Sequence, residues 1–448
     1  MNGRAMWIAL ALLMVAPEAR SEVEITVYNQ DLALVKDTRK LIFEQGVTEI
    51  PFTDVASAID PTTVTLTVPD STMGVRLLEQ NYRYDLVSAD KILANYLGRT
   101  IRALSKQGRV SEGKLLSADA TSLTIEYGDS GLTTLTRAEL ANVEYPSLPA
   151  GMLIRPTLVW KLQSELSRAA FAEVSYLTGR IGWHAEYVAV LDSSDSSLRL
   201  SGWASIDNQS GATYVEARIN LVAGEVNRIR EELRPAFMIA DPLGVRAGIT
   251  ARMEERPLFE YHLYTLSDPS TLHNNETKQL ALFQPATVRT DRTYTYEDGK
   301  VRVSLEFLNS PEAGLGIPLP RGKFRVMKAD SDGALQFIGE DRIAHTAMNE
   351  KVRARLGNAF DVVGERKHLS LRKISGPGVE EEFEIRLRNH KSTDVTVAVI
   401  EHLIGDWTIT ETTVPYEKSD YRTAEWRVTV PANGESTIGY TVRQKNID

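Results

Sequence analysis

Two serines have the residue spacing that comes nearest to a reactive centre, because each is followed by a lysine three positions later. The pairs are Ser88 with Lys91 and Ser370 with Lys373. In exported penicillin-binding enzymes, this spacing places the lysine one helical turn from the serine that it activates. The sequence has no Ser-Asp-Asn or Lys-Thr-Gly motif beside them and no Gly-x-Ser-x-Gly elbow. Ser88 is better explained as a helix N-cap, and Ser370 falls in a predicted strand, where positions i and i+3 face opposite sides.

Residue types that bind metals are present but dispersed. No two of the seven histidines have the spacing of a ligand pair; they occupy positions 184, 262, 273, 345, 368, 390 and 402. The densest group is Glu401-His402 with Asp406, which we predict to be a surface loop. Asp330-Ser331-Asp332-Gly333 resembles part of a calcium loop without its terminal glutamate, and is better explained as a hairpin turn. We expect no metal and no cofactor.

Three further patterns could indicate a catalytic or ligand-binding site. The glycine-rich stretch Gly314–Pro320 ends in two prolines where a phosphate-binding helix would have to begin, so we predict a turn-rich crossing between strands. Paired carboxylates for glycoside cleavage stay open, because distances in space are not visible in a sequence. One block of aromatic residues could form a sugar-stacking platform, although core packing is the favoured explanation; it comprises Trp160, Tyr176, Trp183, Tyr187 and Trp203. We therefore assign no catalytic, cofactor-binding or metal-binding residue.

The first 21 residues have the three parts of an export signal. Arg4 provides a positive start, Met6–Ala16 is an apolar run, and Ala19-Arg20-Ser21 offers a cleavage site after Ser21. An N-terminal membrane anchor is less favoured, because the run is shorter than the roughly 20 residues that span a bilayer. The chain has no cysteine, which excludes disulfides and thiol catalysis. We expect a periplasmic or secreted protein with no transmembrane segment in the mature chain.

The composition is that of a globular protein of several domains. The 448 residues are 42% hydrophobic and 25% charged, and the formal net charge is −9. A length of this kind predicts about three domains. The acidic balance argues against a nucleic-acid partner, which requires a basic face.

Alternation of apolar and polar residues predicts a mainly β fold made of several antiparallel β-sandwiches with a small inserted SH3/Sm-like barrel. We divide the mature chain into an N-terminal β-unit (22–80), the helix-plus-barrel module (81–147), a β-sheet block (148–224), an irregular linker (225–257) and a C-terminal β-sandwich (258–448). Two stretches, Ile206–Thr213 and Leu387–Asp394, each end a strand with asparagine and a polar run. They predict two hairpins of similar shape in related sandwiches, with chance similarity as the alternative.

Several short phrases together resemble a family of exported bacterial proteins grouped as domain of unknown function 4139. The phrases are Val27–Gln30, Ala33–Val35, Phe52–Val55, Ile59–Pro61, Tyr176–Thr178, Gly182–Trp183, Asn208–Ala212, Leu221–Gly224 and Leu315–Pro320. The resemblance covers most of the mature chain. It implies a β-rich protein of the cell envelope with no established activity, and it provides no catalytic residues.

Three hypotheses of function follow from these patterns. The first is an exported, non-catalytic protein that binds or scaffolds a protein or envelope partner. The second is a periplasmic hydrolase of cell-wall or other polysaccharide, which requires two acids about 5–9.5 Å apart in one cleft. The third is a carbohydrate-binding protein, which requires the aromatic rings around Trp183 and Trp203 to be exposed.

Overall fold

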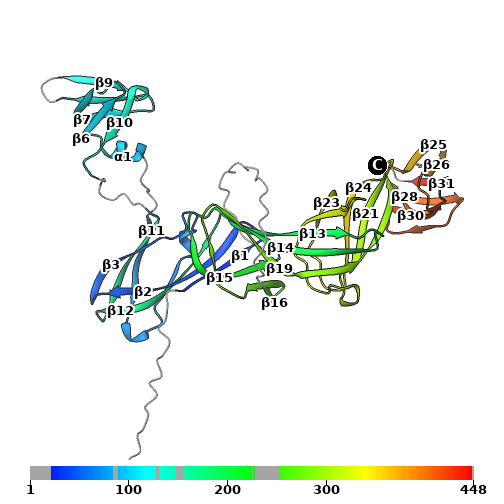
Figure 1. Cartoon of the computed structure of the whole chain (residues 1–448), viewed down its shortest axis with the longest axis horizontal. Helices are drawn as coiled ribbons and strands as arrows, with labels where there is room; N and C mark the ends of the chain where they lie inside the picture. The colour runs from blue at the N-terminus through cyan, green and yellow to red at the C-terminus, as the bar shows by residue number, and fades with distance from the viewer. Residues whose placement is uncertain are drawn as a thin grey trace, which may run out of the picture.

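The computed structural model describes residues 22–83, 89–127, 131–147, 149, 155–224, 226–227, 253–374, 376 and 378–445. Within these ranges the chain is mainly β, as predicted, and its strands form six sheets. Apart from the small module that contains β6 to β10, the described chain extends along the long axis of the molecule from the N-terminal to the C-terminal strands (Figure 1). No helix in the described part is long and apolar enough to cross a membrane. The predicted export signal and Ser88 lie outside the described residues.

The first sandwich is built around a large sheet of the order β16-β17-β15-β1-β2-β12-β4, with β18 beside β15. Its strands are β1 (Glu22–Tyr28), β2 (Leu32–Phe43), β4 (Thr65–Thr67), β12 (Arg168–Thr178), β15 (Tyr214–Ala223), β16 (Met253–Leu258), β17 (Tyr261–Leu266) and β18 (Ser270–Leu272). A short sheet of β3 (Gly46–Thr53), β11 (Thr157–Ser164) and β5 (Arg76–Arg83) lies at the same end of the molecule (Figure 1).

A five-stranded sheet packs against the large one and completes this sandwich. Its order is β19 (Glu276–Arg289), β14 (Ser197–Asn208), β13 (Ile181–Leu191), β22 (Gly322–Ala329) and β23 (Leu335–Ile343). Alternate residues of β12 and β13 are buried, as the period of two requires. The Trp183 indole of β13 donates a hydrogen bond to the Val222 carbonyl of β15, at 3.0 Å, so the two sheets share one core.

The C-terminal sandwich has its own core. One sheet has the order β24 (Lys351–Asn358), β21 (Lys300–Leu308), β20 (Asp291–Glu297), β27 (Val395–His402), β30 (Thr423–Val430) and β29 (Tyr416–Lys418). The other has the order β25 (Val362–Ile374), β26 (Gly378–Asn389), β31 (Gly434–Lys445) and β28 (Asp406–Thr412). The faultless alternation of Phe383–Arg388 and Trp426–Val430 in the sequence corresponds to β26 and β30.

The small inserted module follows the predicted order of one helix and five strands. It comprises α1 (Ala89–Asn95), β6 (Thr100–Ser105), β7 (Val110–Ala118), β8 (Ser122–Glu126), β9 (Leu132–Thr136) and β10 (Leu140–Glu144). The sheet order is β10-β6-β7-β8-β9, and β9 and β10 form its two edges in the described part, so the barrel is open. Leu93 and Tyr96 close one side of its separate core. Figure 1 shows the module standing away from the other sheets.

Some predicted boundaries were wrong. The alternating stretch Thr63–Val68, which predicts a strand of six residues, forms only the short β4, because Asp60 caps a 3-10 turn at Pro61–Thr63. β3 was not predicted, and β5 continues beyond Gln80 to Arg83. The last residues of the linker predicted at 225–257 belong to β16, while most of the linker lies outside the described residues. Three strand pairs, β1–β15, β13–β22 and β20–β27, are parallel within otherwise antiparallel sheets.

The two sandwiches repeat one strand order. The series β1, β2, β12, β13, β14, β15, β18 and β19 corresponds to β20, β21, β24, β25, β26, β27, β30 and β31. In both series the first strand pairs in parallel with the sixth. The fifth pairs with the fourth and the eighth in both. The suspected similarity between residues 206–213 and 387–394 therefore lies at equivalent places of two topologically equivalent sandwiches.

A buried asparagine occupies this equivalent place in each sandwich. Asn208 Nδ2 donates to the carbonyls of Ala212, Leu272 and His273 at 2.9, 3.4 and 2.9 Å. Asn389 Nδ2 donates to the carbonyls of Thr393, Val430 and Pro431 at 2.8, 3.2 and 3.1 Å. Each Oδ1 accepts a backbone N–H two residues later, from Ser210 and Lys391 respectively. One side chain thus joins the end of its own strand to the end of a distant one.

We predict that Asn389→Asp destabilises the C-terminal sandwich by about 2–4 kcal/mol, because buried carbonyls lose their donor and face a buried carboxylate. Urea unfolding followed by fluorescence measures the change. Asn358→Asp is the matched control, since Asn358 is exposed in β24 of the same sandwich, and its expected change is within about 0.5 kcal/mol. Equal stability of the two variants would contradict the role given to Asn389.

Candidate functional site

The aromatic block is part of the core. Trp160, Tyr176, Trp183 and Tyr187 are each at most 2% exposed. The indole of Trp160 donates to Gln80 Oε1 at 2.9 Å, and the Tyr187 hydroxyl donates to the Pro320 carbonyl at 2.7 Å. Trp203 is half-buried. A stacking platform would require exposed ring faces, so the favoured explanation of this block, core packing, agrees with the structure.

The sequence candidates for serine and metal chemistry are not brought together. Ser370 lies on the exposed strand β25, where its hydroxyl donates to Glu382 Oε2 at 3.2 Å. His402 faces Glu297 across the surface, with Nε2 and Oε1 2.9 Å apart. The hairpin predicted around Asp330 is confirmed, because Asp330 Oδ1 accepts the N–H groups of Asp332 and Ala334 between β22 and β23. No group of three potential ligands among the described residues could hold a metal ion.

Glu401 points to the opposite side of β27 from His402 and forms a buried polar cluster. It is 9% exposed and accepts hydrogen bonds from the Tyr440 hydroxyl at 2.7 Å and from Arg366 Nε at 3.0 Å. Burial, the neighbouring carboxylate and its hydrogen bond raise the pKa of the Tyr440 hydroxyl, with the Arg366 charge opposing. The Arg366 guanidinium also lies over the Phe383 ring, 3.7 Å from its centre. This cluster fastens β25 to the sandwich, and we assign it a structural role.

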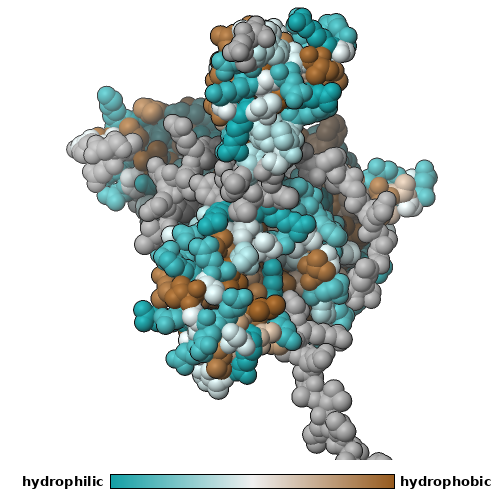
Figure 2. Space-filling model, turned by 90° about the vertical axis from the view of Figure 1, so that its left-hand side faces the viewer, coloured by the Kyte–Doolittle hydropathy of each residue, from teal (hydrophilic) through white to brown (hydrophobic). Residues whose placement is uncertain are grey.

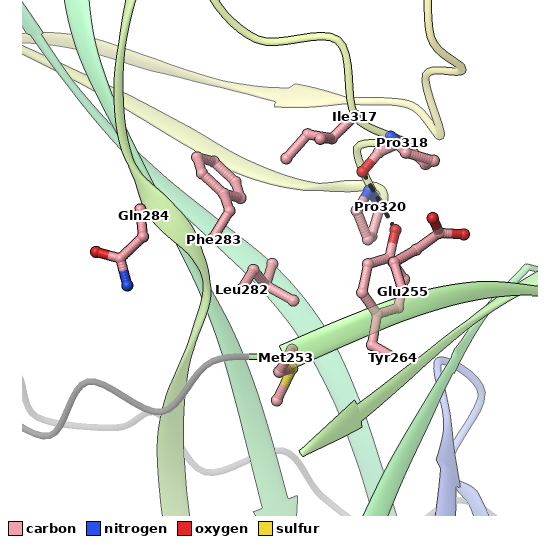
Figure 3. A pocket seen from close by; sticks show the side chains of 9 residues that line it. All are labelled: Met253, Glu255, Tyr264, Leu282, Phe283, Gln284, Ile317, Pro318 and Pro320. Carbon is pink, nitrogen blue, oxygen red and sulfur yellow. Dashed lines mark hydrogen bonds between the residues drawn. The ribbon is translucent and has the colours of Figure 1, made fainter. Parts of the chain in front are cut away.

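A cavity of about 230 Å³ opens between three elements of the first sandwich. The hairpin β16–β17 contributes Met253, Glu255 and Tyr264, and β19 contributes Leu282, Phe283 and Gln284. The crossing that precedes β22 contributes Ile317, Pro318 and Pro320. Figure 3 shows Phe283 and Leu282 on one side, facing Tyr264, Pro318 and Pro320 on the other.

The β19 wall owes its shape to two consecutive bulges. The register with β14 shifts between Leu200 and Gly202 and again between Gly202 and Trp203. Pro285 lies in this stretch, where an edge strand tolerates a residue without an N–H. The partner strand has a glycine opposite Phe283, and a Cβ at Gly202 would lie 2.2 Å from a Phe283 ring carbon. The missing side chain lets the Phe283 ring lie across the strand and line the cavity.

The crossing wall is the glycine-rich stretch that the sequence suggested as a turn-rich connection. Asn309 Nδ2 donates to the Ile317 carbonyl at 2.6 Å, and Leu319 forms an isolated antiparallel bridge with Thr346. The Tyr264 hydroxyl donates to the Pro318 carbonyl at 3.2 Å (Figure 3). Burial, with a smaller contribution from the Glu255 charge, raises the pKa of Tyr264 above its ordinary value, which is itself well above neutral pH. These bonds hold the two prolines against the β16–β17 hairpin.

The polar groups of the cavity lie at its edge. The Glu255 side chain is 32% exposed, and its Oε1 lies 2.8 Å from His262 Nδ1. Gln284 is exposed and points away from the other labelled side chains (Figure 3). Leu282, Met253 and Tyr264 are buried. The cavity is therefore apolar inside and has one carboxylate at its mouth.

A second, more open cavity of about 280 Å³ lies between strands of both sandwiches. Its one carboxylate, Asp195, is already paired with Lys328 and with Arg292, the latter at 2.6 Å. Each of the two cavities thus contains one acid, whereas glycoside cleavage requires two. Neither cavity supports the hydrolase hypothesis.

Edge strand β25 presents a different kind of surface. Residues 365–373 are each classed as exposed, although Arg366 and His368 pack over the Phe383 ring, and the only sheet partner of this stretch in the described part is β26. Leu369 and Leu371 are 51% and 57% exposed. An exposed edge with apolar side chains can pair with another strand.

The opposite end of the molecule has exposed apolar residues that are scattered over several elements. Exposed apolar residues there include Ile42, Val47 and Leu166, on β2, β3 and the β11–β12 connection. Figure 2 shows apolar groups at this end in small separate areas among hydrophilic ones. Single exposed apolar residues are usual for protein surfaces.

Comparison with known proteins gave no relative: no family model matches the sequence, and neither does any curated protein. The resemblance to domain of unknown function 4139 stays a prediction. The sequence reasoning also missed the cavity. The proline within an otherwise alternating strand at Pro285 was the one available signal, because it indicates an edge strand or a bulge.

We predict that Gly202→Ala destabilises the protein by about 1–3 kcal/mol, because the new methyl group displaces the Phe283 ring. Gly439→Ala in β31 is the control, since its Cβ would meet only Thr413 Cγ2, at 3.5 Å. The control should stay within about 0.5 kcal/mol of the unchanged protein in urea unfolding. Loss of stability in the control alone would refute the packing described for Phe283.

Proposed function

We propose that this chain is an exported, non-catalytic protein of the cell envelope that binds a partner protein through the edge of β25. The observation that carries the proposal is the exposed stretch 365–373 at a sheet edge, whose backbone is paired on one side with β26 and has no second strand partner in the described part. A strand of this kind offers its free edge to an added strand, and alternate side chains then supply specificity.

The exposed apolar side chains of this stretch indicate the partner's chemistry. Of its four cationic side chains, Arg366, Lys367 and Arg372 are each paired with a carboxylate, of Glu401, Glu365 and Glu380 respectively. Leu369 and Leu371 interrupt the charges. The complementary occupant is an extended segment of another protein with apolar residues at alternate positions, because Leu369 and Leu371 offer exposed apolar side chains to an added strand.

The placement of the polar side chains supports a binding role. The histidines at positions 184, 262, 368 and 402 each lie beside a carboxylate, and Ser370, Glu401 and Asp330 bond to neighbours that stabilise strands or turns. Each of these side chains is thus engaged with a neighbouring residue. Export rests on the sequence of residues 1–21, and localisation in the periplasm or outside the cell is part of the proposal.

We predict that Leu371→Glu weakens partner binding about tenfold, because it replaces an apolar contact with a charged side chain. The assay compares the amount of each envelope protein crosslinked to the purified mature chain and to the variant, at equal concentration and mild salt.

Leu132→Glu is the matched control, because Leu132 is 64% exposed on the edge strand β9 of the small module. It should leave crosslinking to the specific partner unchanged, and both variants should unfold at the temperature of the unchanged chain. A partner retained equally by both variants would show that β25 is not the binding edge. No partner at native levels would refute the binding function itself.

A further inference from the structure

The cavity between β16–β17, β19 and the crossing before β22 has the size of a site for a small molecule. Its volume is about 230 Å³. An apolar cavity of about 150 Å³ in another protein is large enough for benzene. The present cavity therefore accommodates one aromatic ring with a short alkyl chain, and it is too small for a peptide or a sugar chain.

The inner surface selects an apolar group. Leu282 and Phe283 provide one wall, and Ile317 with Pro318 and Pro320 provides the other. The carbonyls of Pro318 and Pro320 already accept hydrogen bonds from Tyr264 and Tyr187. A ligand's apolar part thus meets carbon surface and carbonyls that are already hydrogen-bonded, which favours its transfer from water by about 0.8 kcal/mol per buried methylene.

The carboxylate at the mouth of the cavity favours a ligand with a positively charged head group. Glu255 is the one charged residue of the nine that line the cavity, and it lies opposite Tyr264 in the β16–β17 ladder. His262 occupies Oε1 of the carboxylate, at 2.8 Å. A carboxylate accepts several hydrogen bonds, so it can also receive the N–H groups of an ammonium. An anionic head group would meet a like charge instead.

We propose that this cavity binds a small amine whose tail is one aromatic ring or a short alkyl chain. The tail lies between Phe283 and Pro318, and the ammonium lies at the Glu255 carboxylate. This site is separate from the β25 edge, so either proposal can fail without the other.

The test compares three probes with one tail and different heads: 4-phenylbutylamine, 4-phenylbutanol and 4-phenylbutyric acid. Saturation-transfer NMR and calorimetry with the full mature chain measure their affinities. The expected order is amine, then alcohol, then acid. Glu255→Gln should weaken the amine about fivefold, as an ion pair at a partly exposed site allows, and leave the alcohol unchanged. Glu254→Gln, the neighbouring change in β16 outside the cavity lining, should alter neither.

A second pair of variants tests the place of the tail. Ile317→Trp fills part of the cavity and should abolish binding of all three probes, whereas Ile404→Trp, at a residue 55% exposed in the C-terminal sandwich, should not. Binding unaffected by Ile317→Trp in a folded variant would overturn the site. Absence of amine binding would overturn it as well, and equal affinity for amine and acid would overturn the choice of ligand. If Ile317→Trp does not fold, the Glu255→Gln comparison decides alone.

Discussion

In each sandwich, the side-chain amide of one buried asparagine hydrogen-bonds the end of its own strand to the end of a distant strand. The order of the strands depends on these bonds. At the strand ends around Asn208 and Asn389, backbone carbonyls of several distant segments meet. Leaving them unpaired would cost about 1–3 kcal/mol each. Asn208 and Asn389 each donate to three such carbonyls and accept one N–H. Because the bonded carbonyls belong to distant segments, these side chains fix which strand ends meet.

The same constraint explains where the two sandwiches differ. Both carry their extra elements at two equivalent points, one between the second and third common strands and one between the sixth and seventh. At the first point, the first sandwich has β3 to β11 and the C-terminal sandwich has β22–β23. At the second point, the first sandwich has β16–β17 and the C-terminal sandwich has β28–β29. The eight common strands keep the same order in both sandwiches. The additional strands are found only in the two connections, which leave the hydrogen bonds of Asn208 and Asn389 intact. The cavity is formed by two of these variable connections together with the bulges of β19.

The local pattern of this fold could be predicted, but its long-range pairing could not. Alternation in Val301–Phe307 and Phe383–Arg388 depends on one buried and one wet face, which a sequence shows directly. The burial of Trp160 and Trp183 followed from the same pattern. The strand β3 was missed because Pro51 interrupts its alternation, although it lies on an edge where proline is tolerated.

The two proposed binding surfaces were harder to predict from the sequence. The cavity needs Gly202, Phe283 and Pro318 to meet, and these residues are far apart in the chain. The free edge of β25 is likewise a property of sheet order, because its alternation resembles that of any paired strand. The similarity between the two asparagine stretches was visible in the sequence, yet only the equivalent hydrogen bonds distinguish it from chance.

The link between the two sandwiches also sets the shape of the cavity. β22 belongs to a connection of the second sandwich but pairs in parallel with β13 of the first, from Ala185 with Gly322 onward. A Cβ at Gly322 would lie 2.1 Å from the Ala185 carbonyl oxygen, so the close approach requires glycine. The cavity wall at Ile317–Pro320 ends two residues before this pairing begins. The contact that joins the sandwiches therefore also holds the cavity wall in place, whereas the edge strand β25 lies away from this junction, in the C-terminal sandwich (Figure 1).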